Sequence, residues 1–229
     1  MNWELMWDSL PRMLGGLSLT LQLIIASLAL GALVAFAVAL LRLSGNRLVE
    51  GLAGAYVFFF RGTPLLVQIF LIYFGLGQFD LIKNSILWPF LREPYWCAIL
   101  ALTLNTGAYT SEVLRGAILS VPQGQVEAAR ACGMSRALAF RRIVLPVAIR
   151  QMLPAYGNEV ILMVKATSLA STITLMEVTG IARRMIAQTF AVFELFIVAG
   201  AIYLVLNFVA TRLIKFAEWR LTPYLRARA

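Results

Sequence analysis

The chain has 229 residues, of which 61% are hydrophobic and 14% charged, with 20 Lys and Arg against 11 Asp and Glu. Soluble domains are about 45–50% apolar and about 25% charged, so this composition excludes an ordinary soluble domain and a disordered chain. It predicts an all-α membrane protein. The chain has no histidine, which excludes histidine-based triads and histidine metal sites. It has only two cysteines, Cys97 and Cys132.

Long apolar runs with few or no charged residues predict five transmembrane helices. They cover residues 13–41, 62–79, 94–111, 156–177 and 195–211. The short apolar segment 51–60 is expected to be an interfacial or buried approach to the second span. Thr63 and Pro64 predict an ordinary helix start, because proline is favoured in the first helical turn; the alternative is a broken helix beside a transport pathway.

The basic residues predict the orientation of these spans. With the N-terminus outside, the cytoplasmic segments receive 14 Lys and Arg and the outer segments 5, while Lys165 lies within the fourth span. Cytoplasmic loops are enriched in Lys and Arg, so this excess predicts an N-out, C-in arrangement. The outer pair Arg183 and Arg184 runs against the trend. Membrane lipid and orientation explain the basic tail, which includes Arg226 and Arg228, better than nucleic acid does.

The one long polar insertion, residues 119–150, is predicted to be a cytoplasmic loop between the third and fourth spans. The first predicted helix of this loop carries small residues on one face. Gly133 ends that helix at a turn, and Ser135 is expected to cap a second helix. Pro146 is expected to end or kink that second helix. The residues alone leave two readings open: a helix that enters a groove on another protein, or a basic loop that only maintains the topology.

This loop resembles the EAA loop of ABC-importer permeases. The matching positions are Glu127, Ala128, Ala129, Gly133, Ile143, Leu145 and Pro146. The segments 61–64, 101–106 and 157–163 extend the resemblance over most of the chain. They look closest to the M-type permease subunits for histidine, lysine, arginine, ornithine and octopine.

The resemblance implies a single permease domain over residues 1–229 in the bacterial inner membrane. The loop would be a coupling helix that docks on a cytoplasmic ATPase dimer, beside a second, homologous permease and a periplasmic binding protein. It implies that basic amino acids or opines are the cargo, with a neutral polar amino acid as the alternative. The sequence has no G-x-x-x-x-G-K-[ST] motif, so we expect no cofactor in this chain, and ATP and magnesium at the partner subunit.

Polar residues inside the predicted spans are candidates for the transport pathway, because ionisable groups are costly in a membrane. Glu159 is expected either to act as counter-ion to a cationic substrate or to form a structural pair with Lys165 or a loop arginine. Ser and Thr in these spans more often indicate close helix packing. The rival classes are an ATP-independent carrier or channel and a membrane enzyme, for which no catalytic constellation is visible. The candidate residues for the transport pathway are Asn105, Thr106, Tyr109, Glu112, Asn158, Glu159, Lys165 and Ser168.

Overall fold

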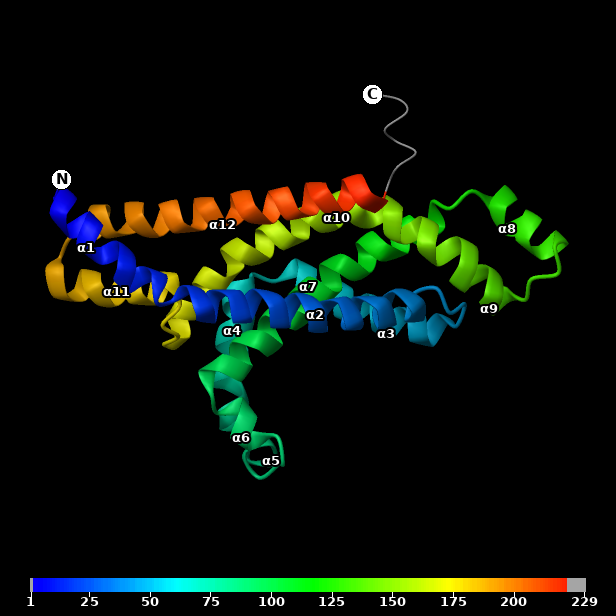
Figure 1. Ribbon diagram of the computed structural model, residues 1–229. Helices are drawn as coiled ribbons and strands as arrows, with labels where there is room; N and C mark the ends of the chain where they lie inside the picture. The colour runs from blue at the N-terminus through cyan, green and yellow to red at the C-terminus, as the bar shows by residue number, and fades with distance from the viewer. Residues whose placement is uncertain (1, 222–229) are drawn as a thin grey trace.

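The computed structural model describes residues 2–221, and every regular element in that range is a helix (Figure 1). The all-α class is thus confirmed, while Arg226 and Arg228 lie outside the described residues. The helices are α1 (Trp3–Leu14), α2 (Leu17–Leu41), α3 (Arg47–Gly62), α4 (Leu65–Phe70), α5 (Asp80–Lys83), α6 (Trp88–Leu91), α7 (Pro94–Leu119), α8 (Gln123–Ala131), α9 (Arg136–Ala139), α10 (Leu145–Ala166), α11 (Val178–Thr189) and α12 (Val192–Leu221). Short π-helical segments, η1 (Leu71–Gly75) and η3 (Phe140–Val144), and 3₁₀ segments, η2 (Leu76–Gln78) and η4 (Thr167–Ile173), continue their neighbours.

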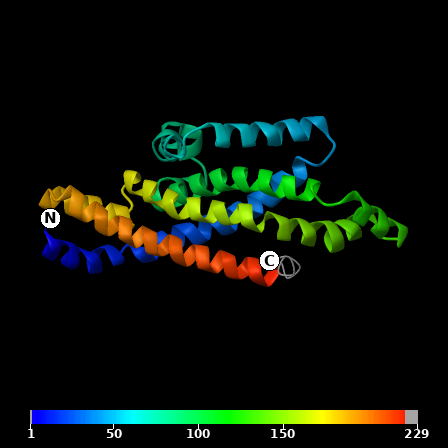
Figure 2. The same ribbon diagram turned by 90° about the horizontal axis from the view of Figure 1, so that it is seen from above.

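The long helices form an elongated bundle around α7. Seen from above, α3 forms one layer, α7 and α10 lie in the middle, and α12 with α1 forms the opposite layer (Figure 2). α7 contacts α2, α3, α4 and α10. α5 and α6 project sideways from the bundle (Figure 1).

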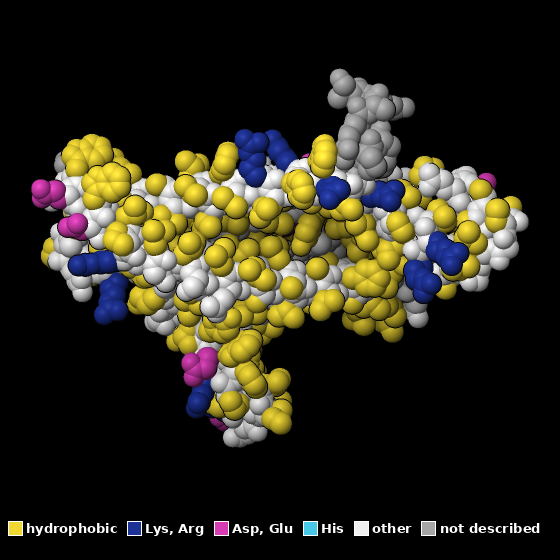
Figure 3. Space-filling model, viewed as in Figure 1, with side chains coloured by type: hydrophobic (Ala, Val, Ile, Leu, Met, Phe, Trp, Pro, Cys, Tyr) yellow, Lys and Arg dark blue, Asp and Glu magenta, His cyan; other side chains and the backbone are white. Residues whose placement is uncertain are grey.

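The two ends of the bundle differ in what they carry. α1 and α11 lie at one end, and α8 and α9 at the other, toward which α12 runs (Figure 1). Hydrophobic side chains dominate the face of the bundle drawn in Figure 3. Such an apolar surface is what a lipid environment requires.

Two described helices, α2 and α12, are long and apolar enough to cross a membrane by length and composition. The count rises to four if each of two bent helix pairs, Arg47–Gly62 with Leu65–Gln78 and Arg136–Ile173 with Val178–Thr189, forms one span. α7 is not among them although it has 26 residues. Its polar face lowers its hydropathy, and a helix surrounded by other helices needs no apolar surface all round.

The second apolar run begins at a sharp break between two helices. α3 and the helical segment after it meet at 107°, and the break falls at Thr63 and Pro64. Pro64 has no N–H, so the Phe60 carbonyl four residues earlier loses its helical donor. Gln68 Nε2 replaces that donor at 2.9 Å and also donates to the Thr63 carbonyl at 3.1 Å. The predicted second span over 62–79 corresponds to α4, η1 and η2 after this break, and Thr63 and Pro64 form the helix break that was the alternative to an ordinary helix start.

The fourth span begins earlier than expected. α9, η3 and α10 run on as one helical stretch, and Pro146 lies in the first turn of α10. In η3 the Leu145 N–H bonds to the Phe140 carbonyl, so the hydrogen-bond register shifts and the proline falls where a missing N–H is tolerated. Of the two predicted outcomes, that Pro146 ends or kinks the second loop helix, the first is wrong for this reason.

Candidate functional site

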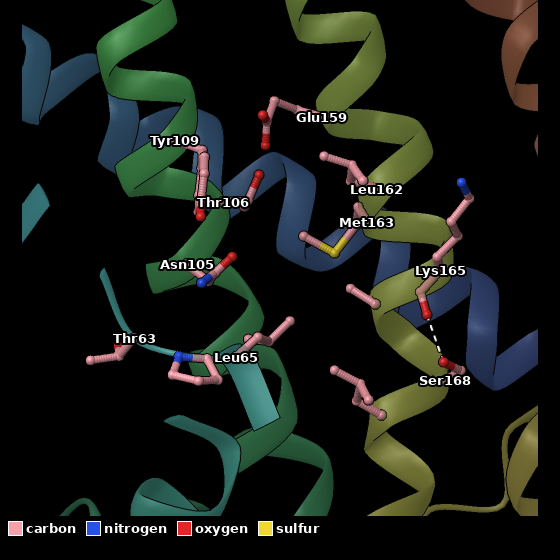
Figure 4. A pocket seen from close by; sticks show the side chains of 13 residues that line it. Thr63, Leu65, Asn105, Thr106, Tyr109, Glu159, Leu162, Met163, Lys165 and Ser168 are labelled. Atoms are coloured by element: carbon pink, nitrogen blue, oxygen red, sulfur yellow. Dashed lines mark hydrogen bonds between the residues drawn. The ribbon is translucent and has the colours of Figure 1, made fainter. Parts of the chain in front are cut away.

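A cavity of about 480 Å³ opens between α7, α10 with η4, and the α3–α4 break. Figure 4 shows side chains from all three elements directed around it. Six of the sequence candidates lie in its lining, although they are up to 63 residues apart along the chain. The lining consists of Thr63, Pro64, Leu65, Asn105, Thr106, Tyr109, Glu159, Leu162, Met163, Lys165, Ala166, Ser168 and Leu169.

Glu159 supplies a carboxylate to this cavity. It lies on α10 and its side chain points toward α7 (Figure 4). It is partly buried, and within residues 2–221 it has no ion-pair partner within 4 Å. The expected structural pairs with Lys165 or a loop arginine are thus not formed.

Lys165 and Ser168 line the cavity further along the same helical stretch. The Lys165 amino group points away from Glu159 (Figure 4), as expected for residues six positions apart, which fall on different helix faces. The Ser168 hydroxyl donates to the Lys165 carbonyl at 2.6 Å. Lys165 therefore lines the cavity with its amino group directed away from the carboxylate.

On the α7 side, Asn105 is tied to the helix break. Its Nδ2 donates to Gln68 Oε1 at 3.0 Å and to the Phe60 carbonyl at 3.3 Å. Thr106 is buried, and its hydroxyl has no hydrogen-bond partner among the described residues. A buried unsatisfied hydroxyl is costly, and this one is shielded from the cavity by its neighbours.

Tyr109 separates this cavity from a second one of about 430 Å³ nearer the α8 end. The second cavity contains Arg42, Arg61 and Glu112. Glu112 forms ion pairs with Arg115 at 2.8 Å and with Arg42 at 3.3 Å. Glu112 thus lies outside the first cavity and is already neutralised.

The structure separates the sequence candidates into three groups. Asn105, Thr106, Tyr109, Glu159, Lys165 and Ser168 lie together, Glu112 lies in the second cavity, and Asn158 is exposed and lines neither. Sequence reasoning did not single out Gln68 or assign a role to Arg61, because their contacts are with residues far along the chain. Pro64 was the available signal, since it marks where carbonyls need other donors.

The loop at the α8 end is built as local sequence signals predicted. Gly133 has φ +79° and closes α8 with two bonds, from its own N–H to the Arg130 carbonyl and from the Met134 N–H to the Ala129 carbonyl. The Ser135 hydroxyl accepts from the Leu138 N–H at 3.3 Å. Both helix ends are therefore capped by nearby residues.

A groove of about 470 Å³ runs along this loop between α8 and the start of α10. Four EAA-loop residues line it: Ala128, Ala129, Ile143 and Pro146. Ala128 is exposed, whereas Ala129 is buried against the loop itself. Glu127 is exposed beside the groove, and Leu145 is not part of its lining.

Among residues 2–221, no group of three or more Cys, Asp or Glu side chains is placed to hold a metal ion. A cavity with a carboxylate in its wall and a projecting capped loop on an all-helical bundle fit a membrane permease. Residues 27–223 match the family of binding-protein-dependent transport system inner membrane components. The chain belongs to this family.

Curated relatives cover almost the whole chain. The octopine transport system permease OccM of Rhizobium meliloti is 58% identical and aligns over 96% of this chain and 90% of its own. The nopaline permease NocM of Agrobacterium fabrum is 57% identical and aligns over 100% of this chain and 95% of its own. The histidine/lysine/arginine/ornithine permease HisM of Salmonella typhimurium is 40% identical and aligns over 98% of this chain and 96% of its own.

Solved structures agree. The crystal structure of an amino acid ABC transporter with histidines superposes with a TM-score of 0.84 at 34% identity, over 96% of this chain and 99% of the other. The inward-facing MetNI methionine transporter gives a TM-score of 0.63 at 20% identity, over 98% of this chain and 99% of the other. At this identity the match supports the fold alone.

These relations establish the class of protein. The chain is an inner-membrane permease subunit of an ABC importer of the amino-acid class, and ATP hydrolysis belongs to a separate subunit. The family resemblance stated from the EAA loop is confirmed. Membership of this family decides against an ATP-independent carrier or channel and against a membrane enzyme.

Proposed function

We propose that this permease carries basic amino acids or opines inward through the cavity between α7 and α10. The observation that carries the proposal is Glu159, a carboxylate without an ion pair that faces a cavity inside the bundle. An unpaired charge in a low-dielectric site is stabilised by an opposite charge. A guanidinium or ammonium group of the cargo supplies that charge.

The remaining lining fits the other end of such a cargo. Asn105 and Ser168 line the cavity with an amide oxygen and a hydroxyl oxygen that can accept hydrogen bonds. The names of OccM, NocM and HisM connect these relatives with octopine, nopaline and basic amino acids. A neutral polar amino acid would leave Glu159 unpaired, which makes it the weaker candidate.

The coupling role is proposed for the loop of residues 119–150. Its groove, with Ala128, Ile143 and Pro146, would receive a surface of the cytoplasmic ATPase dimer, and Glu127 would make polar contacts beside it. Small residues allow close approach of a partner. ATP and magnesium would act in that ATPase, and this chain would bind no cofactor.

We further propose five spans with the N-terminus outside, formed by α2, the α3–α4 region, α7, α10 with η4, and α12. The placement of α1 and α11 at one end and α8 and α9 at the other supports opposite sides for the termini. A second, homologous permease would complete the pathway, and a periplasmic binding protein would deliver the cargo at the α1–α11 end.

The test is ATP-driven uptake by the complete transporter in liposomes. Glu159→Gln should lower the efficiency of arginine uptake by about tenfold or more, because the cation loses its partner. Glutamine uptake, measured in the same liposomes, should not fall. Asn158→Ala, next to Glu159 but outside the cavity, is the matched control and should match the unmodified transporter. Normal arginine uptake by Glu159→Gln would refute the proposal.

A further inference from the structure

Tyr109 is the shared wall of the two cavities, because it lines both. The second cavity lies toward the coupling loop, since Glu112 on its wall is nearly one turn further along α7. A cargo that leaves the first cavity in that direction passes Tyr109. The residues that hold Tyr109 therefore bear on substrate passage.

Arg61 holds Tyr109 by two contacts. Its guanidinium carbon lies 5.2 Å from the centroid of the Tyr109 ring, a cation–π distance. The Tyr109 hydroxyl donates to the Arg61 carbonyl at 3.4 Å. Arg61 is also next to last in α3, directly before the break.

The charges around this wall are unevenly paired. At the second cavity Glu112 pairs with both Arg42 and Arg115, so one carboxylate is shared by two arginines. Within the described residues Arg61 has no ion-pair partner within 4 Å, and neither has Glu159 on the other side of Tyr109. Arg61 therefore lies on the ring of a tyrosine that also lines the cavity containing Glu159.

We propose that Arg61, held on the Tyr109 ring, is a tethered cation that competes with the cationic end of the substrate for Glu159 and so sets the affinity of the cavity. This role rests on the proposed function. With the cavity empty, Arg61 partly neutralises Glu159. A substrate guanidinium or ammonium that approaches Glu159 is repelled by Arg61, so binding is weaker than the carboxylate alone would give.

Competition of this kind has a defined thermodynamic consequence. A fixed positive charge near the binding carboxylate lowers the affinity of the cavity for a cation by electrostatic repulsion. Removing the competing charge should therefore tighten the binding of cations, which is opposite to the effect of removing a residue that contacts the substrate. The effect should also require the Glu159 carboxylate.

The experiment is equilibrium binding of labelled arginine to the complete transporter in lipid nanodiscs without ATP. Arg61→Gln should lower the Kd at least about fivefold, the lower end of typical couplings between linked sites. Arg61→Lys keeps the positive charge, so its Kd should stay close to that of the unmodified transporter. Arg47→Gln, at the start of the same helix and outside both cavities, is the control for removing an arginine from α3.

A double variant separates this role from a structural one. In a Glu159→Asn background, where arginine binding is weak but measurable at high concentration, Arg61→Gln should bring no further tightening. An unchanged or raised Kd in Arg61→Gln alone would overturn the inference. If Arg61→Gln does not assemble, Arg61→Met is used and the same Kd decides. Arginine binding that is indifferent to Glu159 would instead overturn the proposed function.

Discussion

At the scale of single residues, the most completely buried carboxylate lies outside the proposed pathway. Glu177 is 0% exposed and caps α11 by accepting from the Thr179 N–H at 2.9 Å and the Gly180 N–H at 2.8 Å. The Tyr203 hydroxyl on α12 donates to the same carboxylate at 2.5 Å. Three donors satisfy this buried charge, so Glu177 joins the bend after η4 to α12.

We expect Glu177→Ala to destabilise the permease by about 2 kcal/mol or more, because it removes an N-cap and leaves buried donors without an acceptor. Thermal unfolding of the purified transporter measures the change. Tyr203→Phe removes one of the three donors and should cost less. Equal melting temperatures of the Glu177→Ala variant and the unmodified protein would show that the hydrogen bonds to Glu177 add no stability.

At the scale of elements, close contacts and breaks position the cavity. A Cβ on Gly31 of α2 would lie 2.3 Å from Cγ2 of Thr106 on α7, so glycine is what allows these helices to approach here. The α3–α4 break brings Thr63 and Pro64 into the same lining. Helix packing on one side and a proline break on the other thus create the space.

The coupling loop depends on one backbone conformation. Nothing lies within 4 Å of a Cβ built on Gly133, so its left-handed φ alone selects glycine. Gly133→Val should therefore cost about 1–2 kcal/mol of strain and loosen the loop, with weaker co-purification of the ATPase.

Gly133→Asn is the matched control, because asparagine tolerates this conformation better than other side chains. It should retain most of the ATPase. Equal retention by the valine variant would mean that the Gly133 turn is not needed for docking.

At the scale of the whole molecule, the two native cysteines report on orientation. Cys132 is exposed in the coupling groove and Cys97 is buried in the bundle. With the proposed N-out topology, a membrane-impermeant maleimide should label Cys132 in inside-out vesicles and not in right-side-out ones. Removal of the ATPase should increase the labelling, since Cys132 lines the groove.

The opposite end supplies the reciprocal probe. In a Cys132→Ser background, Thr189→Cys at the end of α11 should be labelled in right-side-out vesicles. Labelling of Cys132 from the outside would contradict the proposed orientation.

The sequence by itself determined the features that depend on composition and on neighbours within a few residues. The apolar content specified a helical membrane protein, because a membrane requires backbone hydrogen bonds to be satisfied within helices. Gly133 and Ser135 specified the loop caps, whose hydrogen bonds join residues at most five positions apart. The EAA pattern specified the family for the same reason, as a local and long motif.

Only the tertiary structure decided which polar residues share a cavity and which are paired. Asn158 and Glu159 are adjacent in sequence, yet one is exposed and the other faces the cavity, because the position of α7 selects one side of α10. Pro64 signalled a break but not its 107° bend, which depends on Gln68 replacing the lost donor and on Asn105 of α7 bonding to it. The Gln68 bond spans only eight positions, but the two Asn105 bonds join residues 37 and 45 positions apart, and no local pattern encodes those.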